Sequence, residues 1–298
     1  MLQPRSQTIS RSTQAASASR RWPRKLWLWL PAFVVLLFFF GVPLLQNGAR
    51  SLGLAALSGQ TAQPTFEHYM RLFGDPYYLG VILNTLKVSA ITTVLCLFLG
   101  YPIAYFMVRK TRKLAMPLLL ILVTPLLTSI IMRTFGWQVL FARRGLVNNL
   151  LIDFGLIDRP MNFLNNAGIV YVGMVHVLIP FMVLSIVPVL RGVDQRLEDS
   201  ARILGAGAFR TFALITVPLS LEGIVTGCAL VFMIANGSFV TMLLLGEGSV
   251  VTLPLLVFQQ FSQAQNLGFA SAMGTVLLLI VLICLYLQAS FNRVKGAR

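Results

Sequence analysis

The chain has 298 residues, of which 57% are hydrophobic and only 11% are charged, and its mean hydropathy is +0.80. A soluble domain carries about a quarter charged residues, so this composition excludes a soluble globular protein and indicates an α-helical membrane protein with several spans. The net charge of +15 does not indicate nucleic-acid binding, because the basic residues cluster in short segments beside apolar runs, which is typical of membrane topology.

Six apolar runs reach or approach the ~20 residues that a helix needs to cross a bilayer core. We expect membrane spans at 26–46, 80–108, 114–134, 168–190, 219–245 and 269–290. Together they predict one all-α membrane domain over 26–291, with no clear internal repeat. Residues 1–25 are rich in Ser and Arg and predict a disordered tail, and residues 292–298 form a second polar tail.

Basic residues lie mainly on alternate loops. Residues 1–25 hold six of them and residues 109–113 hold four, and others follow in the central loop and after the sixth run. The positive-inside rule therefore predicts that both termini and the central loop are cytoplasmic.

Two segments between spans are too amphipathic to be free loops. Residues 133–167 contain Trp137, Phe141 and Phe154 among polar residues, and we expect one or two short helices there, at the outer surface. Residues 251–267 predict another external helical piece.

The central polar loop, 191–218, has the pattern of a short amphipathic helix. Leu197, Ala201, Leu204 and Ala208 recur at helical spacing. Gly205 then permits a turn. Such a helix between two spans can lie in the lipid interface, or it can fit its apolar face into a groove on another protein.

This loop resembles the cytoplasmic loop of the membrane subunits of ATP-binding-cassette (ABC) importers. The family pattern is Glu-Ala-Ala, three residues, Gly, nine residues, Ile, any residue, Leu-Pro. Here Asp199-Ser200-Ala201 stands for the triplet, and Gly205, Ile215 and Pro218 fall at the expected spacing. Asp, Ser and Val217 are conservative departures in charge, size and branching.

Over roughly residues 65–290 the chain is similar to permeases of the spermidine/putrescine type. The stretches that carry this likeness are Leu99–Tyr105, Arg133–Trp137 and Gly237–Thr241. The resemblance implies the type I ABC importer permease fold, with six transmembrane helices and a cytoplasmic coupling helix, in the bacterial inner membrane.

The same resemblance implies a set of partners. They are ATP-binding-cassette ATPase subunits, a second homologous permease subunit and a periplasmic substrate-binding protein. ATP and magnesium would be held by the ATPase, and no cofactor is expected in this chain, which has no phosphate-binding loop motif. The residues implied to couple to the ATPase are Leu197, Glu198, Asp199, Ser200, Ala201, Leu204, Gly205, Ala206 and Pro218.

Polar residues within spans tend to face the bundle interior or a water-filled cavity, because their desolvation in lipid is costly. The candidate pathway residues are Arg133, Trp137, His176, Asn236, Ser238 and Thr241. Two alternatives stay open: His176 can be a hydrogen-bonded structural residue, and Asn236-Gly237-Ser238 can serve close helix packing.

The substrate implied by resemblance is a polyamine, either putrescine or spermidine. Putrescine-type relatives often carry Glu where this chain has Ser238, and a polycation in a low dielectric favours an acidic partner. The second membrane subunit could supply that charge. The alternative is an opine or amino-acid-like solute carried by the same class of transporter.

An intramembrane enzyme or a receptor fits the sequence less well. We find no Gly-x-Ser-x-Gly or His-Glu-x-x-His motif, and Cys96, Cys228 and Cys284 lie far apart without metal-ligand spacing. The chain is therefore not expected to be an enzyme.

Overall fold

The computed structural model describes residues 25–54, 64–110, 115–164, 166–246 and 248–296. These residues form helices joined by turns and short loops, with no strand in the described ranges. The chain divides after Gln46 into two compact units. The predicted tail over 1–25 lies outside the described residues except for Lys25, where the first helix begins.

The first predicted span is helical throughout. It consists of α1 (Lys25–Leu36), the π-helical η1 (Leu37–Gly41) and α2 (Val42–Ser51). Its apolar part, Leu30–Ser51, is long enough to cross a bilayer. The helix therefore ends five residues beyond the predicted limit at 46.

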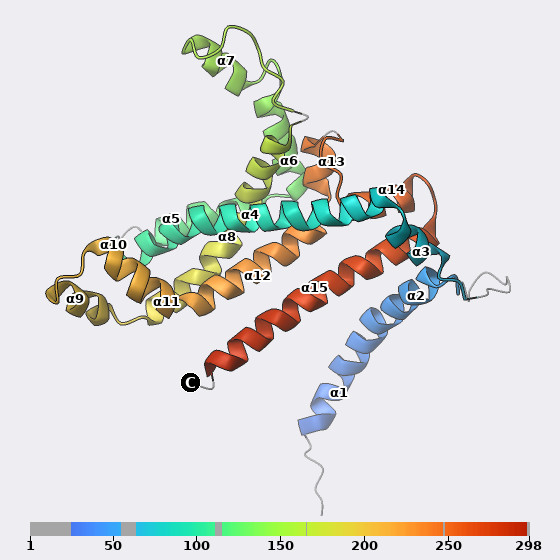
Figure 1. Cartoon of the computed structure of the whole chain (residues 1–298), viewed down its shortest axis with the longest axis horizontal. Helices are drawn as coiled ribbons and strands as arrows, with labels where there is room; N and C mark the ends of the chain where they lie inside the picture. Colours follow the sequence, from blue (N-terminus) through green and yellow to red (C-terminus); the bar gives the residue numbers. More distant parts are fainter. Residues whose placement is uncertain (1–24, 55–63, 111–114, 165, 247, 297–298) are drawn as a thin grey trace, which may run out of the picture. The chain divides into compact units, whose positions relative to one another are not determined.

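The remaining helices belong to the second unit (Figure 1). They are α3 (Glu67–Gly74), α4 (Pro76–Arg109), α5 (Ala115–Val123), η2 (Thr124–Leu127), α6 (Ile130–Phe141), α7 (Leu146–Asp153), α8 (Ala167–Gly192), α9 (Gln195–Ile203), α10 (Ala208–Thr211), η3 (Phe212–Thr216), α11 (Val217–Leu219), α12 (Leu221–Gly237), α13 (Val240–Leu245), α14 (Leu253–Ser262) and α15 (Leu267–Gly296).

The core of this unit lies where α4, α8 and α12 pack against one another. Met182 of α8 is fully buried there. A Cβ atom on Gly227 of α12 would lie 2.8 Å from its Sδ atom, and one on Gly100 of α4 would lie 3.1 Å from its Cγ atom. Glycine at these two positions lets both helices approach α8 closely, as small residues do in membrane bundles.

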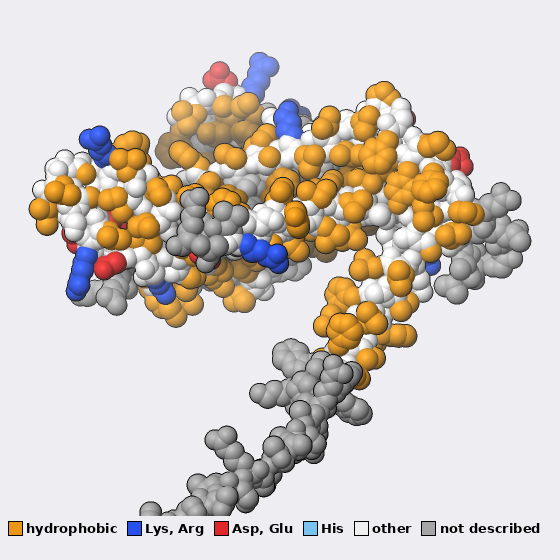
Figure 2. Space-filling model, turned by 60° about the horizontal axis from the view of Figure 1, so that its bottom comes forward, with side chains coloured by type: hydrophobic (Ala, Val, Ile, Leu, Met, Phe, Trp, Pro, Cys, Tyr) orange, Lys and Arg blue, Asp and Glu red, His pale blue; other side chains and the backbone are white. Residues whose placement is uncertain are grey.

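Large apolar side chains also cover much of the outer surface, as Figure 2 shows for one face. On α4, Leu83, Val94 and Phe98 are each more than 60% exposed, and on α15 Tyr286 and Leu287 are similarly exposed. A soluble protein rarely exposes so much contiguous apolar surface, whereas helices in a bilayer turn such side chains to lipid.

Four helical stretches are long and apolar enough to span a membrane, and two bent pairs raise the number to six if each pair is one span. The unbent stretches in the second unit are Pro76–Arg109, Ala167–Gly192 and Leu267–Arg293. These match the predicted second, fourth and sixth spans. The last helix continues to Gly296, beyond the predicted limit at 290.

The predicted third span over 114–134 is not one straight helix. The chain bends by 98° between Leu127 and Ile130. Pro125 lies in the 3-10 turn before the bend, and Thr128 and Ser129 are extended. The new helix α6 therefore begins inside the predicted span, and α6 and α7 supply the two short helices expected over 133–167.

The predicted fifth span over 219–245 is not one straight helix either. The chain bends by 69° at Ser220, between α11 and α12. It breaks again after Gly237, where Ser238 has an extended backbone. The small polar step at Asn236-Gly237-Ser238 therefore ends the helix, and α13 follows. The predicted helical piece within 251–267 is α14.

Candidate coupling site and candidate pathway residues

The amphipathic helix predicted in the central loop is α9. Asp194 caps its start, accepting a hydrogen bond from the backbone N–H of Arg196 at 2.9 Å. Glu198 in the first turn and Arg202 in the last turn both suit the helix dipole. These local signals are the reason that the sequence forms a helix here.

Gly205 ends α9. Its φ of +87° lies in the left-handed region that favours glycine. This conformation lets the N–H of Ala206 bond to the carbonyl of Ala201, while the N–H of Gly205 bonds to the carbonyl of Arg202, both at 3.0 Å. The two bonds form a Schellman motif. Ala208, which the spacing placed on the same helix, instead begins α10 beyond this turn.

The tip of this segment exposes apolar side chains. Ile203 is 86% exposed, Leu204 88% and Phe209 83%, and Leu197 is about half exposed. Of the other predicted coupling residues, Asp199, Ser200, Gly205 and Pro218 are exposed, whereas Ala201 and Ala206 are half-buried. This surface is open to a partner.

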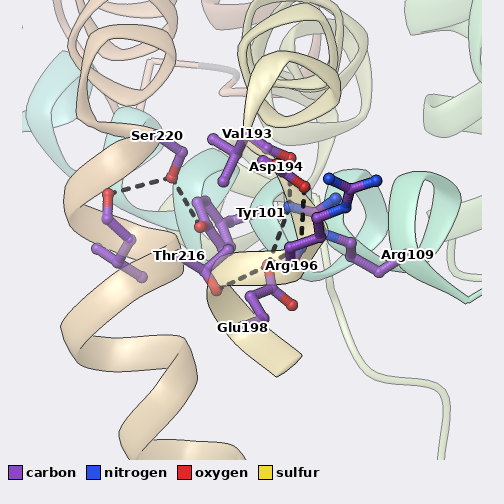
Figure 3. Close-up of polar contacts among 9 residues, drawn as sticks. Tyr101, Arg109, Val193, Asp194, Arg196, Glu198, Thr216 and Ser220 are labelled. Carbon is purple, nitrogen blue, oxygen red and sulfur yellow. Dashed lines mark hydrogen bonds and ion pairs between the residues drawn. The ribbon is translucent and has the colours of Figure 1, made fainter. Parts of the chain in front are cut away.

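Glu198 is the exception among the predicted coupling residues, because it is 98% buried. Its Oε1 atom lies 3.0 Å from both Nε and Nη2 of Arg109, at the end of α4. Thr216 of η3 donates to the same oxygen at 3.1 Å (Figure 3). The carboxylate therefore points into the bundle and not toward the exposed surface of α9.

Arg109 ties a third segment to this pair. Its Nη2 atom also donates to the carbonyl oxygen of Val193 at 3.0 Å, at the end of α8, and the Arg109 side chain is only 7% exposed. One guanidinium group thus joins α4, the turn between α8 and α9, and α9 itself (Figure 3). The planar fork of donors on arginine suits this geometry.

A second polar contact joins α4 to the segment that follows α9. The hydroxyl groups of Tyr101 and Ser220 are 2.8 Å apart and buried. The ring of Phe212 packs edge-on against the rings of Tyr101 and Tyr105, with centroids 5.4 Å apart in each case. The end of α4 therefore contacts both the beginning and the end of the loop.

The residues that form these two polar contacts, with Glu198 and between α4 and Ser220, were not predicted as functional residues. Arg109 lies in a basic cluster that the sequence explains by topology alone, and Tyr101, Thr216 and Ser220 lie in or beside apolar runs. The one sequence signal that could have indicated a buried polar contact is Glu198 itself, an acidic residue directly beside the apolar stripe of α9.

Among the candidate pathway residues, the structure brings Trp137 and His176 together. The indole Nε1 atom of Trp137 on α6 donates to Nδ1 of His176 on α8 at 3.2 Å, with ring centroids 5.2 Å apart. This bond accounts for His176 as a hydrogen-bonded residue within a span. Arg133, one turn before Trp137, donates to the carbonyl of Thr128 at 2.8 Å and so satisfies the backbone at the bend.

The other three candidates surround the break between α12 and α13. Asn236 is fully buried, and its Nδ2 atom donates to the carbonyl of Phe232 on its own helix. Its Oδ1 atom, and Oγ1 of buried Thr241, find no hydrogen-bond partner in the described part of the chain. Ser238, between them, is half-buried.

No group of three His, Cys, Asp or Glu residues that could hold a metal ion occurs among the described residues. Cys96 is buried, and Cys228 and Cys284 are half-buried, all three as free thiols.

Known proteins resemble this chain in sequence and in fold. The family model for the inner membrane component of binding-protein-dependent transport systems matches residues 96–294. The spermidine/putrescine transport system permease protein of Haemophilus influenzae is 36% identical over 261 residues, which cover 87% of this chain and 91% of that protein. The corresponding permease of Escherichia coli K12 is 32% identical, over 76% of this chain and 82% of its own length.

The fold has a counterpart among solved structures. A chain of a bacterial ABC transporter involved in the import of alginate superposes with a TM-score of 0.73, at 19% identity, covering 89% of this chain and 95% of its own. At that identity the likeness concerns the fold alone, which is the ABC importer permease fold. With the family model matching two thirds of its length, the chain belongs to the family of binding-protein-dependent transport system inner membrane components.

Proposed function

We propose that this chain forms half of the translocation pathway of an ABC importer for a polyamine such as putrescine or spermidine. The observation that carries the proposal is the 36% identity to a spermidine/putrescine permease over almost the full length of both chains. The second half of the pathway comes from a homologous permease subunit. A periplasmic binding protein delivers the solute.

In this proposal α9 is the coupling helix that fits into a groove of the ATPase. The exposed apolar residues Ile203, Leu204 and Phe209 support this role, because a partner groove would bury them. Asp199 and Ser200, also exposed, lie on the accessible surface of the same helix. ATP and magnesium are held by the ATPase.

The proposed orientation rests on where the basic residues lie. The end of α4 with Arg109, the end of α8 and α9 meet at one end of the bundle. This end also carries Lys110, Arg191 and Arg202. By the positive-inside rule, the proposed orientation has this end of the bundle and both termini facing the cytoplasm of a bacterium.

Transport then proceeds by alternating access. ATP draws the paired ATPase subunits together, and the coupling helices move with them and turn the bundle outward. The binding protein releases its solute into the pathway, and hydrolysis resets the bundle. ATP drives this cycle only because it binds the two conformations with different affinity.

The proposed pathway includes Arg133, Trp137, His176, Asn236, Ser238 and Thr241. Its support is that Oδ1 of Asn236 and Oγ1 of Thr241, on the two sides of the helix break, are buried without a hydrogen-bond partner among the described residues. Such atoms are costly to bury, and a solute with N–H donors would satisfy them. Cysteines introduced at 236 and 238 should react with a water-soluble thiol reagent in one conformation of the transporter, whereas permanently unreactive sites would indicate helix packing.

A second candidate is an opine or amino-acid-like solute. Ser238 favours it, because a neutral side chain at the helix break offers a polycation no charge. In the polyamine case the acidic partner lies elsewhere in the transporter.

The test is ATP-driven uptake by the reconstituted complex, comparing putrescine and spermidine with a panel of amino-acid-like solutes. Saturable polyamine uptake supports the proposal. Uptake of an amino-acid-like solute alone would exclude polyamines and keep the transporter class. A complex that neither binds an ATPase nor takes up any solute would contradict both.

A further inference from the structure

The coupling helix is linked to α4 by a buried ion pair. α9 packs on its neighbours in sequence, α10 and η3. Its link to α4 runs through the Glu198 side chain, which reaches Arg109 across 89 positions of sequence. Among the hydrogen bonds and ion pairs of the described residues, the direct contact between α9 and α4 is made by this carboxylate.

The geometry of this pair favours rigidity. Oε1 of Glu198 accepts hydrogen bonds from Nε of Arg109 and from the hydroxyl of Thr216. It also lies 3.0 Å from Nη2 of Arg109, which donates its hydrogen bond to the carbonyl of Val193. Hydrogen bonds that share partners in a low dielectric strengthen one another and fix one arrangement. Both side chains are more than 90% buried, so water does not compete for them.

An ion pair in such a place needs a reason beyond stability. Removing two charges from water is costly, so an apolar pair of similar volume often stabilises a fold equally well. What a buried ion pair adds is a defined relative position of two elements. Here the two elements are the proposed coupling helix and the end of a long core helix.

We propose that Arg109 and Glu198 form a clamp that makes α9 and the end of α4 one rigid lever. When the ATPase displaces α9, the clamp transmits the displacement to α4. The Tyr101–Ser220 contact passes it from α4 to the start of α12. Glu198 is then a positioning residue inside the permease, and the inference rests on the proposed role of α9 as the coupling helix.

The first test uses Glu198→Gln in the reconstituted complex, with hydrolysis and uptake measured together. We expect the ATPase to remain bound and to hydrolyse ATP, while solute uptake per ATP falls about tenfold, the factor that corresponds to losing a charge-assisted hydrogen bond. Glu222→Gln is the matched control, because it removes an exposed acid at the beginning of α12, outside the clamp, and should leave uptake per ATP unchanged.

The double variant Arg109→Gln/Glu198→Gln distinguishes a clamp from a general folding defect. It removes both charges and leaves two amides that can hydrogen-bond, so we expect uptake per ATP above that of Glu198→Gln alone. A folding defect would instead add the two losses. Additive losses, or unchanged uptake per ATP in Glu198→Gln, would overturn the proposal.

A spectroscopic test needs no transport activity. Spin labels are attached to the full chain at Ile203→Cys and Lys110→Cys, which are both exposed positions. Cys96, Cys228 and Cys284 are replaced by alanine so that they take no label. The two labels report the distance from α9 to the end of α4. We expect a narrow distance distribution that broadens in Glu198→Gln. Equal widths would refute the lever. A narrow distribution in the labelled chain, together with no ATP-driven uptake by the unlabelled chain that keeps Ile203 and Lys110, would refute the proposed function and leave the clamp standing.

Discussion

Replacing Arg109 by alanine leaves the Glu198 carboxylate buried without its cationic partner. Removing one partner of a buried ion pair typically costs about 3–5 kcal/mol. Thr216 still donates to Oε1 at 3.1 Å and recovers part of this, whereas the Val193 carbonyl loses its donor as well. We therefore take about 3 kcal/mol as the net penalty on the packed position of α9.

The chain can avoid this penalty by releasing α9, so that Glu198 reaches water. Local opening of the α9 segment should then become easier by the same 3 kcal/mol, which corresponds to roughly 150-fold faster exchange of its amide hydrogens. Amide exchange read by mass spectrometry on peptides that cover 195–211 measures this directly. Peptides from the middle of α8 should keep their wild-type exchange, because Met182 and Ile186 remain buried in the core.

Arg202→Ala is the control, because it removes an exposed arginine from the last turn of α9. Losing its interaction with the helix dipole costs about 0.3–1 kcal/mol, or at most about fivefold in exchange. Exchange over 195–211 that is the same in Arg109→Ala as in the wild type would refute the reasoning, since the ion pair would then contribute nothing to holding α9.

Three further predictions concern single positions. Asp199→Lys reverses the charge of an exposed residue on α9, so it should weaken ATPase association in a pull-down and abolish uptake while the protein still inserts; normal coupled uptake would contradict the coupling-helix assignment. Gly205→Val places a β-branched residue at φ +87°, a strain of about 1–3 kcal/mol, and should lower the ATPase activity that the loaded binding protein stimulates; unchanged stimulation would count against it. Gly227→Val adds atoms that meet Met182 Sδ at 2.8 Å and should destabilise the bundle by about 1–3 kcal/mol in a thermal-unfolding assay, whereas Gly237→Ala, with open space around its Cβ position, should have a much smaller effect.

A helix at α9 was predictable because short-range signals determine it, although the apolar spacing extended it too far, to Ala208. Asp194 supplies the cap and Gly205 the left-handed turn, and both act within a few residues of the helix ends. The positions of most spans were predictable for a similar reason, since an apolar run of sufficient length must be helical in a bilayer.

The breaks within spans were not predictable from hydropathy, because hydropathy depends only on how apolar the residues are and not on the backbone conformation. The third and fifth runs are apolar across their bends, at 128–129 and at Ser220. The fold tolerates the bend at 128–129 because Arg133 donates to the exposed carbonyl of Thr128. At the second bend the hydroxyl of Ser220 pairs with that of Tyr101. The first contact joins residues only five apart, whereas the second depends on tertiary structure, because 119 positions separate its two residues.

Glu198 and Asp199 show where the resemblance to importer loops stops being informative. The two acids are adjacent, and one step along a helix turns a side chain by about 100°. Asp199, which stands for the acid of the family pattern, is exposed and available to a partner, whereas Glu198 is buried against Arg109. The family pattern therefore identifies Asp199, the acid on the exposed face of α9. The acid that fixes the helix to the bundle becomes visible only when α4, 89 residues earlier in the chain, is brought beside it.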